Sequence, residues 1–167
     1  EKMDPVLTYM YLMLRMSRDK HKRITRDAFQ AAGKDIKLFP GVEGWFDRIN
    51  KFGDEQGVKI EHYIISSGLA EIIKGTSIAK YFKRIYACEF LYDRETKEAI
   101  WPRQAINYTT KTQFLFRISK GILDTQEDNA LNAKITDNER RIPYRNMIYL
   151  GDGLTDEAAF EYVKLLV

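Results

Sequence analysis

The chain has 167 residues, of which 44% are hydrophobic and 13% are aromatic. This length fits one domain, or one domain with a small subdomain, and the apolar content excludes global disorder. The 27 basic and 24 acidic residues give a net charge of only +3, too weak to indicate nucleic-acid binding but compatible with a small anionic substrate. A single cysteine, Cys88, excludes an internal disulfide, and we expect a cytoplasmic protein.

The first apolar segment, residues 6–14, is too short to cross a bilayer and is followed by no small-residue cleavage site. We therefore expect neither a membrane anchor nor a signal peptide. An Asp-Pro pair instead begins a helix over residues 6–16, which is apolar on nearly every side and should be covered by protein on most faces. Its Met and Tyr side chains belong to the core or, alternatively, line a substrate pocket. A charged connector with His21 on the surface precedes another short helix at residues 25–30.

The next segments predict a helix and a strand that leads into a turn. Residues 43–52 form an amphipathic helix, which Gly53 ends, and residues 58–65 form a strand that becomes buried toward its end. The strand terminates at residues 66–68, Ser-Ser-Gly, and residues 69–74 start a helix. The serine hydroxyls then lie at a strand-to-helix turn, where free backbone N–H groups bind anions. A serine that merely caps the helix is the alternative.

A hairpin follows, with strands at residues 84–92 and 99–106, and its Trp-Pro pair favours an edge position for the second strand. Cys88 falls inside the first of these strands. We expect it to be a small core residue, because no histidine is placed to activate it as a nucleophile. His62, within the preceding strand, is expected to be a structural or surface residue rather than a base.

Lys111 lies in the first turn of a helix predicted over residues 111–121. Cations are disfavoured at a helix N-terminus, so a lysine there is unusual unless it has an anionic partner. The alternative is an exposed lysine at a small energetic cost. Residues 124–145 are polar and carry little apolar surface, which indicates a long irregular excursion.

Residues 147–150 are apolar and end abruptly in a Gly-Asp-Gly turn, after which an Ala-rich helical pattern begins. This predicts a buried strand, a tight loop and a helix. Loops at the carboxyl ends of strands bind ligands in open α/β sheets, and this loop carries Asp152 and Asp156. Two carboxylates suit Mg²⁺, and glycines let the backbone turn where side chains would crowd the metal. An ordinary turn, with Asp156 capping the helix, is the alternative.

Together these segments resemble motifs two, three and four of the haloacid dehalogenase superfamily. The motifs are Ile64-Ile65-Ser66-Ser67-Gly68, then Lys111, then Gly151-Asp152-Gly153-Leu154-Thr155-Asp156. The phosphoserine-phosphatase-like branch is the most similar, through Pro40-Gly41-Val42 and Tyr86-Ala87-Cys88-Glu89-Phe90. The resemblance covers roughly residues 38–160. It implies an α/β fold with a Rossmann-like core and a parallel sheet at residues 38–167, and a small, mostly helical cap with its connector at residues 1–37.

The resemblance also implies roles for individual residues. Ser66, or Ser67 if the register is off by one, would bind the transferring phosphoryl group with nearby backbone N–H groups, and Lys111 would neutralise its charge. Asp152 would hold Mg²⁺, and Asp156 would support the metal site directly or through water. These roles suit phosphoryl transfer, which depends mainly on positioning and charge stabilisation. The implied activity is hydrolysis of a small phosphorylated metabolite through an aspartyl-phosphate.

The chain departs from the family pattern at both ends. The first family motif, a strand ending in Asp-x-Asp that supplies the nucleophile, has no match in these residues, and the chain starts at Glu1 rather than at Met. The family core also usually continues beyond the helix after motif four. We therefore expect a piece of a longer phosphatase, incomplete at both ends and inactive alone. The alternative is a non-catalytic relative that binds a phosphorylated ligand or a protein partner.

Overall fold

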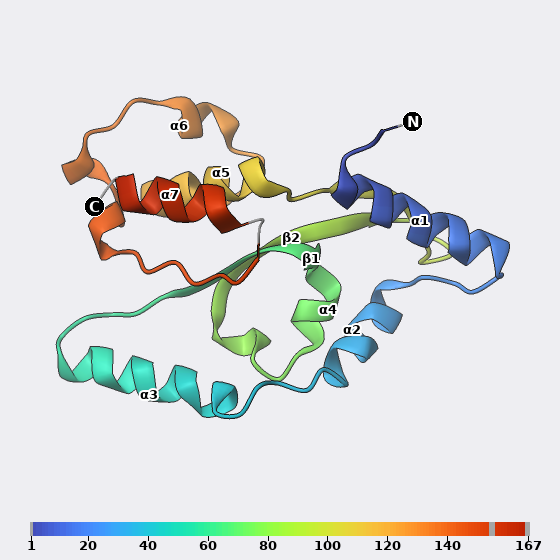
Figure 1. Cartoon of the computed structure of the whole chain (residues 1–167), viewed down its shortest axis with the longest axis horizontal. Helices are drawn as coiled ribbons and strands as arrows, with labels where there is room; N and C mark the ends of the chain where they lie inside the picture. Colours follow the sequence, from blue (N-terminus) through green and yellow to red (C-terminus); the bar gives the residue numbers. More distant parts are fainter. Residues whose placement is uncertain (1, 154–155, 166–167) are drawn as a thin grey trace. The chain divides into compact units, whose positions relative to one another are not determined.

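The computed structural model describes residues 2–153 and 156–165, which fall into two compact units, Glu1–Ala105 and Ile106–Val167 (Figure 1). The fold is mixed α/β, as predicted, and the boundary expected near residue 37 between cap and core stays a prediction. The first unit contains α1 (Pro5–Asp19), α2 (Arg26–Lys34), α3 (Val42–Glu55), β1 (His62–Leu69), α4 (Ala70–Gly75), the 3-10 turn η1 (Ala79–Tyr81), β2 (Phe82–Tyr92) and β3 (Ala99–Gln104). The second contains α5 (Tyr108–Lys120), α6 (Asp128–Asn132), the 3-10 turns η2 (Asp137–Glu139) and η3 (Tyr144–Asn146), and α7 (Glu157–Leu165).

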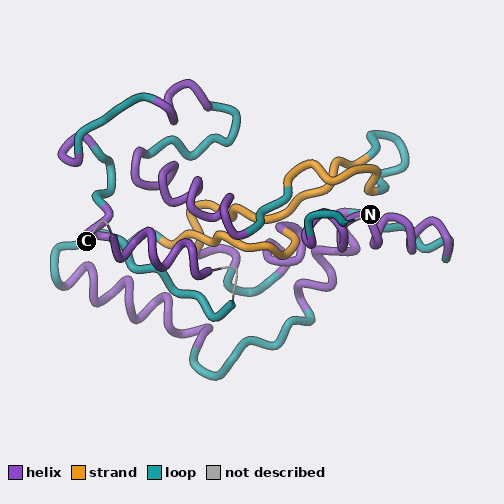
Figure 2. The backbone as a smooth tube through the Cα atoms, turned by 45° about the horizontal axis from the view of Figure 1, so that its top comes forward, coloured by secondary structure: helices purple, strands orange, loops and turns teal. Residues whose placement is uncertain are grey.

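The sheet of the first unit has three strands in the order β1-β2-β3 (Figure 2). β1 and β2 are parallel and are joined through α4 and η1, whereas β2 and β3 form the predicted antiparallel hairpin. The expected parallel sheet is thus present as one parallel pair within a mixed sheet. β3 lies at the edge, where Pro102 needs no backbone N–H for a neighbour.

Helix α1 begins at the predicted cap, because the Asp4 carboxylate accepts hydrogen bonds from the first backbone N–H groups of the helix. It does not bury most of its faces, so that prediction was wrong. One stripe with a spacing of four residues is buried: Val6, Met10 and Leu14. Leu7, Tyr11, Leu12 and Met16 are exposed, whereas Tyr9 and Met13 are partly buried. Continuous apolar sequence therefore overstated how much of the helix is covered.

Helix α3 continues past Gly53, which was expected to end it, and runs to Glu55. The residue that ends the helix is the next glycine, Gly57, whose φ of +69° places it in the left-handed region that follows many helix C-termini. His62 is a structural residue, as expected: its Nε2 lies 2.8 Å from the Asn50 amide oxygen, and its ring packs edge-on against Phe46. Burial lowers the pKa of the His62 imidazole.

Helices α2 and α4 approach until their backbones touch. A Cβ added at Gly33 would lie 2.1 Å from the Ile72 carbonyl oxygen, and one added at Gly75 would lie 2.1 Å from the Gln30 carbonyl oxygen. Both positions therefore require glycine. Cys88, fully buried in β2, is the small core residue that the sequence predicted.

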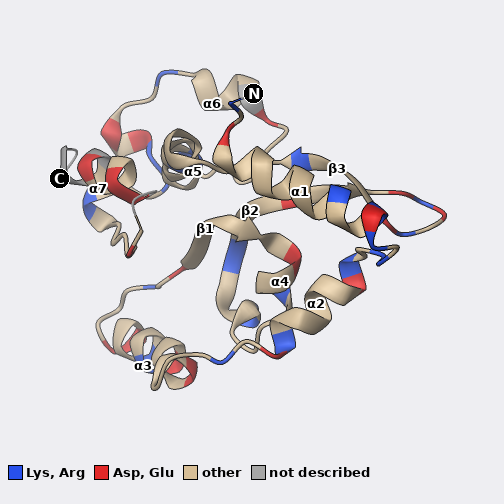
Figure 3. Ribbon diagram, turned by 45° about the vertical axis from the view of Figure 1, so that its right-hand side comes forward, with Lys and Arg blue, Asp and Glu red and all other residues tan. Residues whose placement is uncertain are grey.

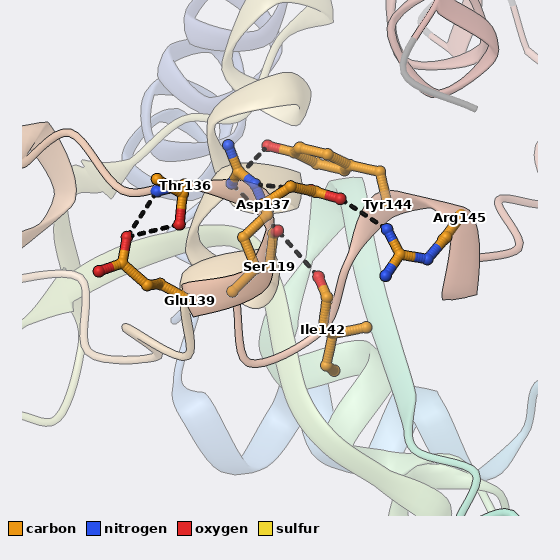
Figure 4. A network of polar contacts seen from close by, with 8 residues as sticks. Ser119, Thr136, Asp137, Glu139, Ile142, Tyr144 and Arg145 are labelled. Carbon is orange, nitrogen blue, oxygen red and sulfur yellow. Dashed lines mark hydrogen bonds and ion pairs between the residues drawn. The ribbon is translucent and has the colours of Figure 1, made fainter.

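The second unit is built around α5, whose predicted bounds are close to the observed ones. Asn107 and Thr110 form a reciprocal N-terminal cap, and Gly121 ends the helix with a φ of +78°. The predicted polar excursion, residues 124–145, contains only short helical turns and is held by polar contacts (Figure 4). These include Thr136 to Glu139 at 2.7 Å, Arg145 to Asp137 at 2.6 Å, and Ser119 Oγ to the Ile142 carbonyl at 2.9 Å.

Basic and acidic residues both occur along the ribbon of each unit, in keeping with the small net charge (Figure 3). Within the described ranges, none of the helices combines the length and the apolar character needed to cross a membrane.

Candidate functional site

A buried ion pair joins two of the residues that the sequence singled out separately. Lys111 projects from the first turn of α5, and Asp156 stands immediately before α7. The Lys111 Nζ lies 2.7 Å from Asp156 Oδ1, and the two side chains are only 5% and 10% exposed. The prediction that Lys111 has an anionic partner is confirmed, which removes the alternative of an exposed lysine.

Asp156 accepts two further hydrogen bonds. The Tyr149 hydroxyl donates to Oδ1 at 2.6 Å, and the backbone N–H of Gly153 donates to Oδ2 at 3.3 Å. Burial alone would raise the pKa of the Asp156 carboxyl, but the hydrogen bonds from Lys111 and Tyr149, together with the Lys111 charge, outweigh burial and hold that pKa below its ordinary value. Asp156 is therefore an ionised carboxylate whose two oxygens are both engaged by protein groups.

Gly151 leaves the space that this carboxylate occupies. A Cβ at residue 151 would lie 2.6 Å from Cγ of Asp156, closer than real side-chain atoms approach. The Tyr149 ring also packs edge-on against Phe160 of α7, with centroids 5.4 Å apart. The turn is thus folded around the Asp156 side chain.

The buried strand predicted at residues 147–150 is wrong. This segment is a loop in which Ile148 is 90% exposed and Leu150 is 75% exposed, while Met147 and Tyr149 are partly buried. The alternation is that of an extended chain with one covered face. The four apolar residues indicated burial on both faces, which requires neighbouring strands, and the described residues place none beside this segment. Its role here is to present Tyr149 to Asp156.

Asp152 occupies the same turn but behaves differently. Its side chain is exposed, and among the described residues it forms no hydrogen bond or ion pair. A free carboxylate fits Mg²⁺, whereas Asp156 is committed to the Lys111 ammonium, which favours the indirect of its two implied roles. The described ranges contain no cluster of three or more His, Cys, Asp or Glu that could hold a metal ion. The fit to Mg²⁺ therefore consists of one ligand, and residues 154–155 of this motif lie outside the described residues.

The Ser-Ser-Gly segment, residues 66–68, belongs to β1 instead of following it, which corrects the predicted strand end. Ile65 pairs with Tyr86 and Leu69 with Cys88, so β1 advances four residues while β2 advances two. The extra residues form a bulge, and bulges commonly redirect side chains beside active sites. Neither serine caps α4, whose N-cap is Leu69, so that alternative is also wrong.

The two serine hydroxyls differ in access. Ser66 Oγ accepts a hydrogen bond from the Gly68 backbone N–H at 3.0 Å in an exposed position. Ser67 Oγ is buried and, within the described part of the chain, has no hydrogen-bond partner. Ser66 is therefore the serine that can reach a ligand. It lies in the first unit, whereas Lys111 and Asp156 lie in the second.

Sequence reasoning missed two tyrosines that contact these segments. Tyr149 was interpreted only as part of an apolar strand, and Tyr9 only as one of the Met and Tyr side chains of α1. The Tyr9 hydroxyl donates to the Ser67 carbonyl oxygen at 2.7 Å. Tyr149 could have been noticed from its place two residues before the Gly-Asp-Gly turn, but nothing in the sequence distinguishes Tyr9 from Tyr11.

Comparison with known proteins gives one relative and no function. The chain is 32% identical over 148 residues to an uncharacterized protein of Borreliella burgdorferi, an alignment that covers 79% of this chain and 50% of the relative. The chain thus spans about half the length of the curated relative it matches. No family model and no solved structure matches the chain.

Proposed function

We propose that this chain is part of a Mg²⁺-dependent phosphomonoester hydrolase with a Rossmann-like haloacid dehalogenase core and a small helical cap. The buried pair of Lys111 and Asp156 carries the proposal. The pair joins residues 45 positions apart that correspond to motifs three and four of that superfamily. A buried lysine held by an ionised carboxylate is a fixed positive charge, which suits stabilisation of phosphoryl transfer.

In the proposed reaction each residue has a separate task. The Ser66 hydroxyl, whose oxygen accepts a hydrogen bond from the Gly68 N–H, donates to a phosphoryl oxygen. Lys111, oriented by Asp156, balances the negative charge of the phosphoryl group. Asp152 would hold Mg²⁺, which would neutralise further phosphate charge. The nucleophile is an aspartate of an Asp-x-Asp motif that these 167 residues do not match, and its attack on phosphorus gives an aspartyl-phosphate that water hydrolyses. The substrate class is a small phosphorylated metabolite of the cytoplasm.

A second candidate is a domain of the same fold that binds a phosphorylated ligand or a protein partner without turnover. The engagement of both Asp156 oxygens by protein groups favours it, because it leaves Asp152 as the single free carboxylate of the motif among the described residues. The residues encoded immediately before Glu1 separate the two candidates. An apolar strand ending in Asp-x-Asp supports the hydrolase, and such a strand without these aspartates supports the binding domain.

The test of the hydrolase is an assay of the intact protein with p-nitrophenyl phosphate and Mg²⁺. We expect turnover that disappears when Mg²⁺ is chelated, and we expect the Asp152→Asn variant to lose at least ~10²-fold in kcat, in the range seen for loss of a stabilising charge. Glu157→Gln is the matched control, because Glu157 is also exposed and lies five residues further on. An Asp152→Asn variant as active as Glu157→Gln would refute the metal assignment.

A further inference from the structure

The bulge in β1 is held from behind by two side chains that share one acceptor. The Ser67 carbonyl oxygen accepts a hydrogen bond from the Tyr9 hydroxyl of α1 at 2.7 Å and another from the Cys88 thiol of β2 at 3.3 Å. Residues in a bulge lose their partners in the strand ladder, so their backbone groups need others. Side chains supply them here, and all of these residues belong to the first unit.

The same peptide group also points toward Ser66. The Ser67 carbonyl and the Gly68 N–H belong to one planar trans peptide unit, so they point in opposite directions. Fixing the carbonyl therefore fixes the direction of the N–H. That N–H donates to Ser66 Oγ at 3.0 Å in an exposed position. The bulge thus presents one hydroxyl and one N–H together, on the side opposite to Tyr9.

Tyr9 is the stronger of the two donors. Its oxygen-to-oxygen distance is that of a well-formed O–H···O bond, whereas a thiol is a weak donor. Burial raises the pKa of the Tyr9 phenol, and its contact with Cys88 raises it further, so the hydroxyl keeps its proton through the whole physiological range. The orientation of the 67–68 peptide therefore depends mainly on one hydrogen bond from α1.

We propose that Tyr9 is a positioning residue, which orients the Gly68 N–H and, through the hydrogen bond from that N–H, the Ser66 hydroxyl that donates to a bound phosphoryl group. This inference rests on the proposed function, because it assigns Ser66 to phosphate binding. It adds that α1 contributes to the site because its Tyr9 hydroxyl holds the Ser67 carbonyl, not because its apolar side chains line a pocket. Loss of the Tyr9 hydroxyl removes the stronger of the two donors to the Ser67 carbonyl, which loosens the 67–68 peptide and weakens phosphate binding.

The test compares Tyr9→Phe with Tyr11→Phe in the intact protein. Both substitutions remove one hydroxyl from the same helix, but Tyr11 is 47% exposed. The readout is the dissociation constant of inorganic phosphate, measured by titration calorimetry in the presence of Mg²⁺. We expect Tyr9→Phe to raise it about 5- to 10-fold, the effect of one neutral hydrogen bond, and Tyr11→Phe to change it less than about twofold.

Thermal unfolding of both variants is measured alongside, since a merely structural role would lower the Tm without changing phosphate affinity. Equal phosphate affinity of the two variants, whatever their Tm, overturns the assignment of Tyr9, as does a wild-type protein that binds no phosphate. The hydrolysis assay tests a separate claim. A wild-type protein that binds phosphate without turnover rejects the hydrolase, and the comparison of Tyr9→Phe with Tyr11→Phe still decides the role of Tyr9.

Discussion

The bulge at residues 66–68 and the turn at residues 151–156 both bring a glycine and a polar side chain to the start of a helix, yet they are held in opposite ways. Neutral donors hold the bulge through a backbone carbonyl, which leaves the Ser66 hydroxyl accessible. A buried ion pair holds the turn through the Asp156 side chain, and among the described residues of the turn the accessible carboxylate is that of Asp152. In the turn, the Asp156 side chain itself holds the structure together, so a substitution there should change stability as well as any ligand binding. In the bulge, the Ser66 side chain does not hold the structure, so the two effects can be separated.

The largest expected effect comes from breaking the ion pair of the turn. Lys111→Met would leave the Asp156 carboxylate buried without its cation, and we expect a loss of about 3–5 kcal/mol in the free energy of unfolding. The matched control is Arg15→Met, since Arg15 pairs with Asp19 in an exposed position. Exposed pairs contribute roughly 0–1 kcal/mol. Urea denaturation of the two variants measures the difference.

The double variant Lys111→Met/Asp156→Asn sharpens this prediction. Removing both charges leaves no unpaired buried ion, so the double variant should be more stable than Lys111→Met alone. A Lys111→Met variant with the stability of Arg15→Met would show that the turn does not depend on its ion pair.

A smaller effect is expected at Gly151. A methyl group there would meet the Asp156 carboxyl at 2.6 Å, and we expect Gly151→Ala to cost about 1–3 kcal/mol, as overpacking usually does. Gly44→Ala in α3 is the control, because its Cβ would meet only the flexible end of Arg48, at 3.0 Å, and alanine favours the helix. Thermal unfolding of both variants provides the measurement, and a Gly151→Ala protein as stable as the control would contradict the packing described for the turn.

The smallest expected effect is on the acid side of the stability profile. The pKa of Asp156 is lower in the folded than in the unfolded state, so its contribution is fully present above the ordinary carboxyl pKa of about 3.9. It is lost as the pH falls through the lower, folded-state pKa. Below pH 4, the slope of unfolding free energy against pH should therefore be smaller in Asp156→Asn than in the wild type, by up to the contribution of one bound proton. Urea denaturation at a series of pH values below 4 measures this slope. An unchanged slope in the variant would show that Asp156 does not contribute to the pH dependence.

The elements that local signals define were predictable. The Asp-Pro start of α1, the polar cap at Asn107 and the glycine after α5 act within one or two turns of chain, so their residues alone specify them. The errors concern elements that need a partner. Whether residues 147–150 pair as a strand, and whether residues 66–68 leave the ladder, depends on the register of other segments, which local sequence does not contain.

The candidate site was predictable to the same degree. Lys111 was conspicuous because its position at a helix N-terminus conflicted with its charge, and the conflict required an anion. The sequence did not show which anion pairs with Lys111, since a carboxylate such as Asp156 can bind a metal ion as well as an ammonium group. Tyr9 and Tyr149 were missed because a tyrosine in an apolar run looks like core, and only the partner of its hydroxyl shows otherwise.

The backbone contact between α2 and α4 determines how the first unit can move. With Gly33 and Gly75 touching backbone atoms across the contact, α2 travels with α4 as one rigid body. The Ala99 N–H also donates to the Ile24 carbonyl at 2.8 Å, which ties the chain just before α2 to the hairpin. Lys22 is hydrogen-bonded to Ser17 at the end of α1, so any swing of α1 must pivot between Lys22 and Ile24. Because α1 carries Tyr9, such a swing would break the hydrogen bond from Tyr9 to the Ser67 carbonyl. Movement of α1 away from the sheet and loss of the fixed orientation of the 67–68 peptide would then occur together.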